Sequence, residues 1–328
     1  MFDHAKPFAA LMFIVATLSG CGMTGMPGKS FRGDLPEATE SQIALQSRLR
    51  RDVEKLAGDI GDRNVLAYGE YTEAANYIQR EFESFGYTVE RQTYQAEGRD
   101  CWNIEVEIRG SSKPDEIVII GGHYDSVFGC PGANDNATAV AAVLELSRNF
   151  ARKTPVRTLR FVAFANEEPP FFQTDLMGSM VYAKRCRDRN ENVVAMIALD
   201  GLGYYSDEKG SQNYPFPFSM LYPSTANFIG FVANNASHKL LRNAIRSFRE
   251  NAQFPSEGVL MPEFIQGAGW SDHWSFWQYD YPGIMVTDTL PFRYHHYHTA
   301  EDTIDKINFD RFARVVEGLR QVIAELVQ

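Results

Sequence analysis

Four short apolar segments, each ending in polar or acidic residues, place the strongest constraint on the fold of this chain. They are EIVIIGGHYDS (116–126), RTLRFVAFANEE (157–168), NVVAMIALDG (192–201) and YPGIMVTDT (281–289). Uninterrupted apolar runs of this length are typical of strands buried on both faces, as in parallel sheets. Ligands of such sheets bind at the carboxyl ends of the strands. The polar ends of the four segments are therefore predicted to form one site.

Helical patterns and a meander of two alternating strands complete the expected elements. Helices are expected over residues 41–58, 72–85 (with Thr72 as the N-cap), 136–152 and 308–326, and the meander strands over 87–94 and 102–110. Buried strands that alternate with helices predict a three-layer α/β/α sandwich with a mostly parallel, mixed central sheet. Because we find no internal repeat and no clear linker, residues 41–328 are expected to form a single domain.

The N-terminal segment has the character of an export signal. Lys6 precedes the apolar run PFAALMFIVATLSG, which is too short to span a bilayer comfortably and predicts a signal peptide over 1–20. The run ends in Leu-Ser-Gly-Cys, which resembles the lipobox of bacterial lipoproteins. This resemblance implies lipidation of Cys21, a tether over 21–40 and attachment to the cell envelope, at the periplasmic face of the outer membrane. The alternative is a plain signal peptide with an incidental cysteine.

Three further cysteines, Cys101, Cys130 and Cys186, follow the N-terminal segment. An exported protein meets an oxidising compartment, so one pair is expected to form a disulfide. We expect the pair Cys101–Cys130, with the alternative that all three thiols are free. None has the C-x-x-C spacing of a zinc site.

The polar strand ends carry residue types that suit metal coordination. His123 stands two residues before Asp125, a carboxylate that can orient the imidazole of a metal ligand. Asp135 follows in the next loop, where it could also simply cap the helix after it. Asp200 closes a wholly apolar strand and needs a partner for its charge.

The adjacent pair Glu167 and Glu168 ends another buried strand. Neighbouring carboxylates repel one another unless a cation neutralises them. A further candidate ligand lies in FRYHHYHTAEDTIDK (292–306), which holds His295, His296 and His298. Imidazoles combined with carboxylates suit zinc, with cobalt or manganese as substitutes, and a bridging carboxylate allows two metals about 3.5–4 Å apart.

The order of the motifs GGHYDS, GANDNA, NEE, LDG, SDH and HTAEDT resembles the co-catalytic zinc aminopeptidase family. This family includes bacterial leucyl aminopeptidase, aminopeptidase Y and glutamate carboxypeptidase II, and the resemblance covers about residues 72–325. It implies a phosphorylase/hydrolase-like fold and two zinc ions per chain. It selects His298 from the histidine tract, with Asp302 completing the motif. His295 and His296 fall outside the motif; we expect them to face solvent or to pack, with lining of the substrate cleft as the alternative.

The resemblance also implies a role for each site residue. Those roles are one zinc bound by His123 and Asp200, a second bound by Glu168 and His298, Asp135 bridging both, Glu167 as general base, and Asp125 supporting His123.

Two features depart from or extend this pattern. Ala268 stands about where bacterial leucyl aminopeptidases have an oxyanion-stabilising Tyr, so a Tyr or a backbone N–H of the long loop 204–224 becomes a candidate donor. The motif Ser271-Asp272-His273 is interpreted as packing around the site, because no serine nucleophile is needed for a metal-dependent hydrolysis.

The expected function is hydrolysis of N-terminal residues from peptides by a zinc aminopeptidase. One alternative is a glutaminyl cyclase-like transferase with a single zinc on the same fold. A carboxypeptidase is disfavoured because no Arg cluster adjoins the motifs, and a non-catalytic binding domain like that of the transferrin receptor is disfavoured because all five ligands are present. The net charge of −10 argues against nucleic acid as a partner. Nothing in the sequence indicates the oligomeric state.

Overall fold

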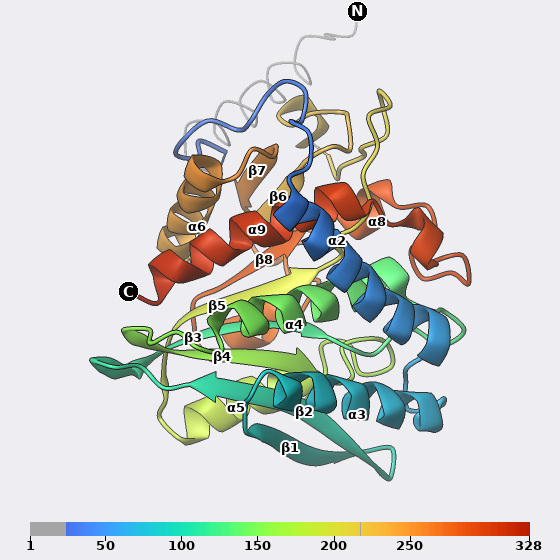
Figure 1. The fold of residues 1–328 in the computed structure, drawn as a ribbon, viewed down its shortest axis with the longest axis vertical. Coiled ribbons are helices and arrows are strands. Elements are labelled where there is room, and N and C mark those ends of the chain that lie inside the picture. The colour runs from blue at the N-terminus through green and yellow to red at the C-terminus, as the bar shows by residue number, and fades with distance from the viewer. Residues whose placement is uncertain (1–23, 217) are drawn as a thin grey trace, which may run out of the picture.

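A computed structural model describes residues 24–216 and 218–328 of the chain (Figure 1). The expected signal peptide and the lipidation site Cys21 therefore lie outside the described residues. Within the described ranges, no helix is both long and apolar enough to cross a membrane.

One eight-stranded sheet forms the centre of the fold, in the order β1-β2-β4-β3-β5-β8-β6-β7. The strands are β1 (Val89–Ala96), β2 (Arg99–Ile108), β3 (Lys113–His123), β4 (Arg157–Phe164), β5 (Asn192–Asp200), β6 (Ile229–Ala233), β7 (Ser256–Leu260) and β8 (Gly283–Thr287). The helices are α2 (Glu40–Val53), α3 (Tyr68–Ser84), α4 (Thr138–Phe150), α5 (Gly178–Asp188), α6 (His238–Asn251), α7 (His273–Trp277), α8 (Leu290–Arg293) and α9 (Phe309–Leu326). Shorter helical segments are η1 (Glu54–Ile60), η2 (Ala133–Ala137), η3 (Phe218–Met220) and η4 (Ile304–Lys306).

The sheet is mixed, as expected. The four strands β4, β3, β5 and β8 run parallel at its centre. The meander β1–β2 joins this core antiparallel through β4. At the opposite edge, β6 pairs antiparallel with β8 and parallel with β7. The carboxyl ends of β3, β4, β5 and β8 therefore meet at one edge of the sheet.

Helices cover both faces, which confirms the three-layer architecture. Alternate residues of β3 point to opposite sides: Val118 and Ile120 belong to the core shared with α2, α3, α4, α6 and α9. Ile117 and Ile119 belong to a second core with α5 and α7. In Figure 1, α4 and α9 lie in front of the sheet. This two-sided burial explains why the central strands are uninterrupted apolar runs.

Over β6 and β8 the second face is covered by loops. A small third core there joins Val232 and Met285 of the sheet to Phe218, Met261 and Ala268 of the surrounding chain. The long loop after β5 and the segment after β7 thus take the place of a helix. Loops leave gaps more readily than a helix does, and a cavity lies between these loops and the sheet.

The second expected helix begins earlier than predicted. α3 starts at Tyr68, and Thr72 lies inside it, where its hydroxyl donates to the Tyr68 carbonyl oxygen at 2.7 Å. The start is set instead by Asn64, whose side-chain oxygen accepts from the backbone N–H of Leu66 at 3.0 Å and of Ala67 at 3.1 Å. An Asn side chain that binds the backbone ahead of a helix fixes the turn that leads into it.

The expected Cys101–Cys130 disulfide is wrong in this structure. Cys101, Cys130 and Cys186 are free, buried thiols. Cys101 lies on β2 beside the amide of Asn166, whereas Cys130 lies in the loop after β3 near the charge of Asp302. Burial raises the pKa of the Cys130 thiol to about 12, because the thiolate loses its hydration there.

The described part of the expected tether packs on the domain. Arg249 of α6 donates to the Pro27 carbonyl oxygen at 3.1 Å, and the Ser256 N–H of β7 donates to the Ser30 hydroxyl at 2.9 Å. β7 is an edge strand, so this segment covers backbone that would otherwise be exposed for pairing.

A buried arginine fixes the loop that leads from β3 towards α4. Arg63 is fully buried, and its guanidinium donates to five carbonyl oxygens: those of Leu56, Gly61, Tyr124, Pro131 and Gly132. Because these acceptors come from two chain segments, one side chain ties the end of η1 to the loop before Asp135.

We expect Arg63→Met to lower the free energy of unfolding by roughly 3 kcal/mol, because the acceptors would lose charged donors in a site that water does not reach. Urea unfolding of the two proteins measures this difference. Arg152→Met, at an exposed arginine on the surface, is the matched control and should leave the midpoint nearly unchanged. Equal midpoints for both variants would contradict the anchoring role.

Candidate metal centre

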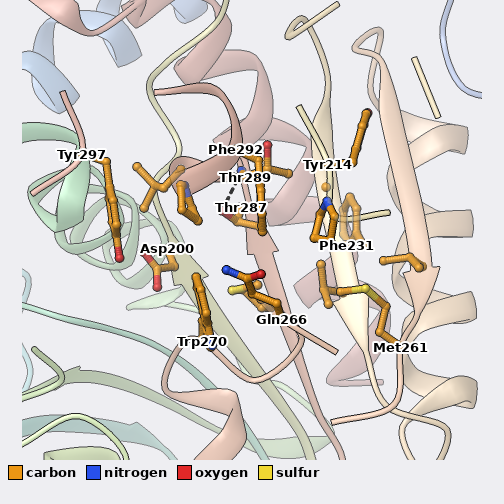
Figure 2. A pocket seen from close by; sticks show the side chains of 18 of the residues that line it. Asp200, Tyr214, Phe231, Met261, Gln266, Trp270, Thr287, Thr289, Phe292 and Tyr297 are labelled. Atoms are coloured by element: carbon orange, nitrogen blue, oxygen red, sulfur yellow. Dashed lines mark hydrogen bonds between the residues drawn. The ribbon is translucent and has the colours of Figure 1, made fainter. Parts of the chain in front are cut away.

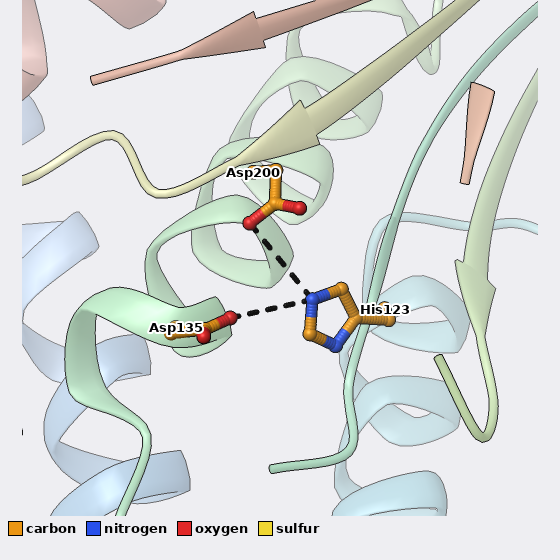
Figure 3. A group of neighbouring side chains, drawn as sticks. All are labelled: His123, Asp135 and Asp200. Carbon is orange, nitrogen blue, oxygen red and sulfur yellow. Dashed lines mark ion pairs between the residues drawn. The ribbon is translucent and has the colours of Figure 1, made fainter. Parts of the chain in front are cut away.

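Six acidic or imidazole side chains converge at the carboxyl edge of the parallel strands. β3 ends at His123 and β5 ends at Asp200, while Glu167 and Glu168 follow the end of β4. Asp135 lies in η2, just before α4. Figure 3 shows His123 facing both Asp135 and Asp200. The sixth residue, His298, comes from the loop after α8.

Asp135 lies between the two histidines. Its Oδ1 is 3.4 Å from Nε2 of His123, which is also 3.9 Å from Oδ1 of Asp200. Its Oδ2 is 3.1 Å from Nε2 of His298, which is also 3.1 Å from Oε2 of Glu168. The two oxygens of one carboxylate thus face two separate groups of candidate ligands.

This arrangement fits metal ions. Ligand atoms about 2.0–2.1 Å from a tetrahedral zinc lie about 3.3–3.4 Å from one another. The observed separations of 3.1–3.9 Å scatter around that value. Within the described part of the chain, Glu168 Oε1, Asp200 Oδ1 and His298 Nε2 are buried without a hydrogen-bond partner. Unpartnered buried donors and acceptors are costly, and a bound cation would satisfy them.

The electrostatics of the cluster also favour a cation. Burial, followed by repulsion from Asp135, raises the pKa of Glu168 to about 7. Burial likewise raises the pKa of Asp200, although the nearby His123 opposes the shift. Both shifts disfavour the ionised carboxylates, and divalent cations would favour the ionised forms.

Asp125 connects His123 to the two glutamates without facing the cluster itself. Its Oδ1 lies 3.4 Å from Nδ1 of His123, and its two oxygens accept from the backbone N–H groups of Glu167 and Glu168, both at 3.0 Å. The Asp125 backbone carbonyl oxygen lies closer to Nδ1 of His123, at 3.2 Å, so backbone and carboxylate together orient the imidazole, while the carboxylate fixes the backbone of the adjacent glutamates. Such carboxylate–histidine pairs set the tautomer of a metal-binding imidazole.

Glu167 forms a third candidate group with His123 and Glu168, which overlaps the two groups that share Asp135. Its Oε2 is 3.8 Å from Nε2 of His123. Burial raises the pKa of Glu167 well above its usual value; His123 opposes this shift and Glu168 adds to it. A buried carboxylate with a raised pKa beside a metal site is well suited to exchanging protons.

Asp302 holds the backbone on which Asp135 is mounted. Its two oxygens accept from the N–H groups of Asn134 at 2.8 Å and Asp135 at 3.0 Å. The hydroxyl of Tyr294 donates to the same carboxylate at 2.7 Å. The sequence motif identified Asp302 but did not indicate that it binds the backbone at Asp135, because the two residues are 167 positions apart in the sequence.

His295, His296 and His273 lie outside the cluster. His295 is exposed, and His296 packs edge-on against Tyr294 with ring centroids 5.5 Å apart. His273 is fully buried, its Nε2 contacts the Ala268 carbonyl oxygen at 2.8 Å, and no hydrogen bond joins it to Ser271 among the described residues. Burial lowers the pKa of His273 to about 4, which keeps the ring neutral.

Tyr297 is a site residue that sequence reasoning missed. Its ring stacks on that of His298, with centroids 3.7 Å apart and an interplanar angle of 22°. In Figure 2 its hydroxyl points towards Asp200. Burial raises the pKa of Tyr297, and the charges of Asp135, Glu168, Glu167 and Asp200 raise it further, so the phenol stays protonated beside the cluster. The sequence feature that could have identified Tyr297 is its position directly before the motif histidine His298.

A cavity of about 270 Å³ leads away from the cluster. Figure 2 shows it extending from Asp200 and Tyr297 past Thr287 towards Tyr214 and Met261. Its lining beyond the cluster is mostly aromatic and aliphatic, and Trp270 and Phe292 stack beside its entrance with ring centroids 6.4 Å apart. Pockets of this apolar type with few polar groups are typical of small-ligand sites.

Comparison with known proteins identifies relatives by sequence and by structure. The uncharacterized protein YfbL of Escherichia coli (strain K12) is 36% identical over 285 residues, which cover 84% of this chain and 87% of that protein. A zinc aminopeptidase from Bacillus subtilis has a similar structure, with a TM-score of 0.69 and 16% identity over 86% of this chain and 95% of that one. Tannerella forsythia glutaminyl cyclase has a TM-score of 0.63 and 19% identity over 85% and 98%. At these identities the two structural likenesses bear on the fold alone.

The sequence model of Peptidase family M28 matches residues 103–323. That span contains all the side chains of the cluster, from His123 to His298, together with Asp302. It agrees with the resemblance found in the motif order. The chain therefore belongs to peptidase family M28.

Proposed function

We propose that this chain is a zinc-dependent aminopeptidase that binds two metal ions and releases N-terminal residues from peptides. The observation that carries the proposal is the position of Asp135, whose two oxygens face His123 on one side and His298 on the other. His123 and Asp200 would hold one ion, Glu168 and His298 the other, and Asp135 both. The zinc aminopeptidase of similar fold supports the choice of metal.

Bound zinc would supply Lewis acidity, which makes water more acidic and polarises a carbonyl group. Glu167 then acts as the general base, taking a proton from the attacking water and donating it to the leaving amine. Its backbone is held by Asp125, so the carboxylate has a fixed position relative to His123.

Tyr297 supplies the hydrogen-bond donor that the Ala268 position lacks. Its phenol is protonated, lies beside the cluster and lines the cavity. A fixed donor of this kind stabilises the negative charge that develops on the carbonyl oxygen during attack by water. Tyr297 is the residue next to the proposed metal ligand His298, and the two rings stack. The stacking therefore positions the hydrogen-bond donor and the metal ligand relative to each other.

The charge of the cavity favours an aminopeptidase over a carboxypeptidase. Among the described residues that line it, several are carboxylates and none is Lys or Arg. With two divalent cations bound to the clustered carboxylates, Glu257 is the acid left uncompensated by metal, and a substrate's terminal carboxylate would find no cationic side chain to pair with it. A glutaminyl cyclase-like transferase remains the alternative, and one zinc per chain with cyclisation of N-terminal Gln peptides would support it instead.

We expect Glu167→Gln to lose about 10²–10⁴-fold in kcat while retaining its zinc, because the amide cannot accept the proton. Turnover of aminoacyl amides and metal analysis of the same sample measure both effects. Glu168→Gln is the matched variant one residue away and should lose zinc as well. Undiminished turnover in Glu167→Gln would overturn its assignment as the base.

Tyr297→Phe should lower kcat by about 10²-fold with little change in KM, since one donor to the reacting oxygen is lost. Zinc content should be unchanged. Tyr214→Phe is the control, because Tyr214 lines the same cavity but donates to the Pro223 carbonyl oxygen at 2.7 Å. Similar kinetics for both variants would show that the Tyr297 hydroxyl has no catalytic part.

A further inference from the structure

The floor of the cavity is a row of residues that crosses four adjacent strands. Asp200 of β5 pairs with Thr287 of β8, Thr287 pairs with Gly230 of β6, and Gly230 pairs with Glu257 of β7. Paired residues in neighbouring strands point to the same face of a sheet. All four line the cavity, so the row runs from the metal cluster at Asp200 to a second carboxylate at Glu257.

The row sets the length of the channel. Strands lie about 4.8 Å apart, so three steps separate Asp200 from Glu257 by about 14 Å. Gly230 adds no side chain to the middle of the row, and a Cβ there would lie only 3.2 Å from the Thr287 carbonyl oxygen and 3.3 Å from Thr289 Cγ2. The row is therefore low between the threonine and the glutamate.

The next row of the sheet makes the channel apolar. Met285, Val232 and Val259 are paired across β8, β6 and β7, two residues from the first row. All three line the cavity, as do the rings of Tyr214 and Tyr222 from the long loop opposite. An aliphatic chain that ran along the polar row would therefore be covered on its other sides by apolar groups.

Glu257 lies at the far end, where its charge is paired only loosely by the nearby Arg249 and Arg32. Its side chain is 26% exposed, and no described residue donates a hydrogen bond to it. Its nearest cation is Arg249, whose Nη2 is 4.0 Å away and donates instead to the Ser256 carbonyl oxygen at 2.8 Å. The other donors of Arg249 serve the Ser256 hydroxyl at 3.1 Å and the Pro27 carbonyl oxygen at 3.1 Å.

The dimensions fit a long side chain that ends in a cation. An extended arginine side chain spans about 7 Å from Cα to its guanidinium group, and lysine spans about 6 Å. With a polar contact of about 3 Å at each end, such a residue bridges most of the distance between the cluster and Glu257. A neutral apolar side chain of the same length would cover the carboxylate without pairing it, which is unfavourable.

We propose that the channel selects substrates whose N-terminal residue is arginine or lysine, with the aliphatic stem lying over Thr287 and Gly230 and the cation on Glu257. This specificity rests on the proposed aminopeptidase function. Glu257 is a binding residue in this account and takes no part in the hydrolysis itself.

The test compares kcat/KM of the zinc-loaded full chain for fluorogenic amides of arginine, citrulline, lysine, norleucine, leucine and phenylalanine. Citrulline has the shape of arginine without its charge, and norleucine is the neutral counterpart of lysine. We expect arginine to exceed citrulline, and lysine to exceed norleucine, by about tenfold or more, as for hydrogen bonds to a charged group.

Variants then locate the effect. Glu257→Gln should bring the arginine-to-citrulline ratio close to one. Glu263→Gln, at an exposed glutamate on the segment after β7, is the matched control and should keep the wild-type ratio. As a readout without turnover, argininamide should bind Glu167→Gln protein more tightly than citrullinamide in calorimetry, and should lose this advantage when Glu257→Gln is added.

The outcomes separate the two proposals. If wild-type protein hydrolyses none of the amides with any metal, the aminopeptidase function itself is overturned. If it hydrolyses leucine or phenylalanine amides but shows no preference for arginine over citrulline, only the specificity is overturned. The wild-type comparison needs no variant, so a folding defect in Glu257→Gln would not obscure the result.

Discussion

The carboxylate of Asp135, shared between His123 and His298, is the interaction on which the rest of the site depends. Its two oxygens join a histidine at the end of a central strand to one on a loop near the C-terminus. The backbone N–H of Asp135 donates to the Asp302 carboxylate. The loop that precedes Asp135 is held by hydrogen bonds from the buried Arg63. Much of the polar structure around the sheet edge thus serves to hold one side chain between two imidazoles.

Hydrogen bonding separates the supporting carboxylates from the proposed ligands. Asp125 and Asp302 accept from backbone N–H groups, which compensate their buried charge. Glu168 and Asp200 each retain a buried oxygen without a partner among the described residues. At these two positions, which belong to the candidate ligand groups, a cation from outside the chain would compensate the charge. Glu257 differs from them, because its side chain is partly exposed and its ion pair with Arg249 is long at 4.0 Å, so a substrate cation would add a closer partner.

Local sequence patterns were enough to predict the central sheet and the residues at its edge. Buried parallel strands have a strong apolar signal, and their carboxyl ends lie at the same edge of the sheet. The sequence therefore predicted that His123 and Asp200 lie close together. β6 and β7 are five residues each and carry too little periodicity to identify. The row from Thr287 to Glu257 depends on the register of three strands that are distant in sequence, and the start of α3 depends on an Asn side chain. Tyr297 and the separation of Cys101 from Cys130 likewise follow from tertiary packing, which local pattern does not encode.

The most direct test of the account is the number and position of metal ions in the wild-type protein. Anomalous diffraction from crystals grown with zinc, together with metal analysis of the same preparation, measures both. The account predicts two zinc ions per chain, one on either side of the Asp135 carboxylate, with His123 bound to one and His298 to the other. A single ion, or two ions that do not share Asp135, would contradict it.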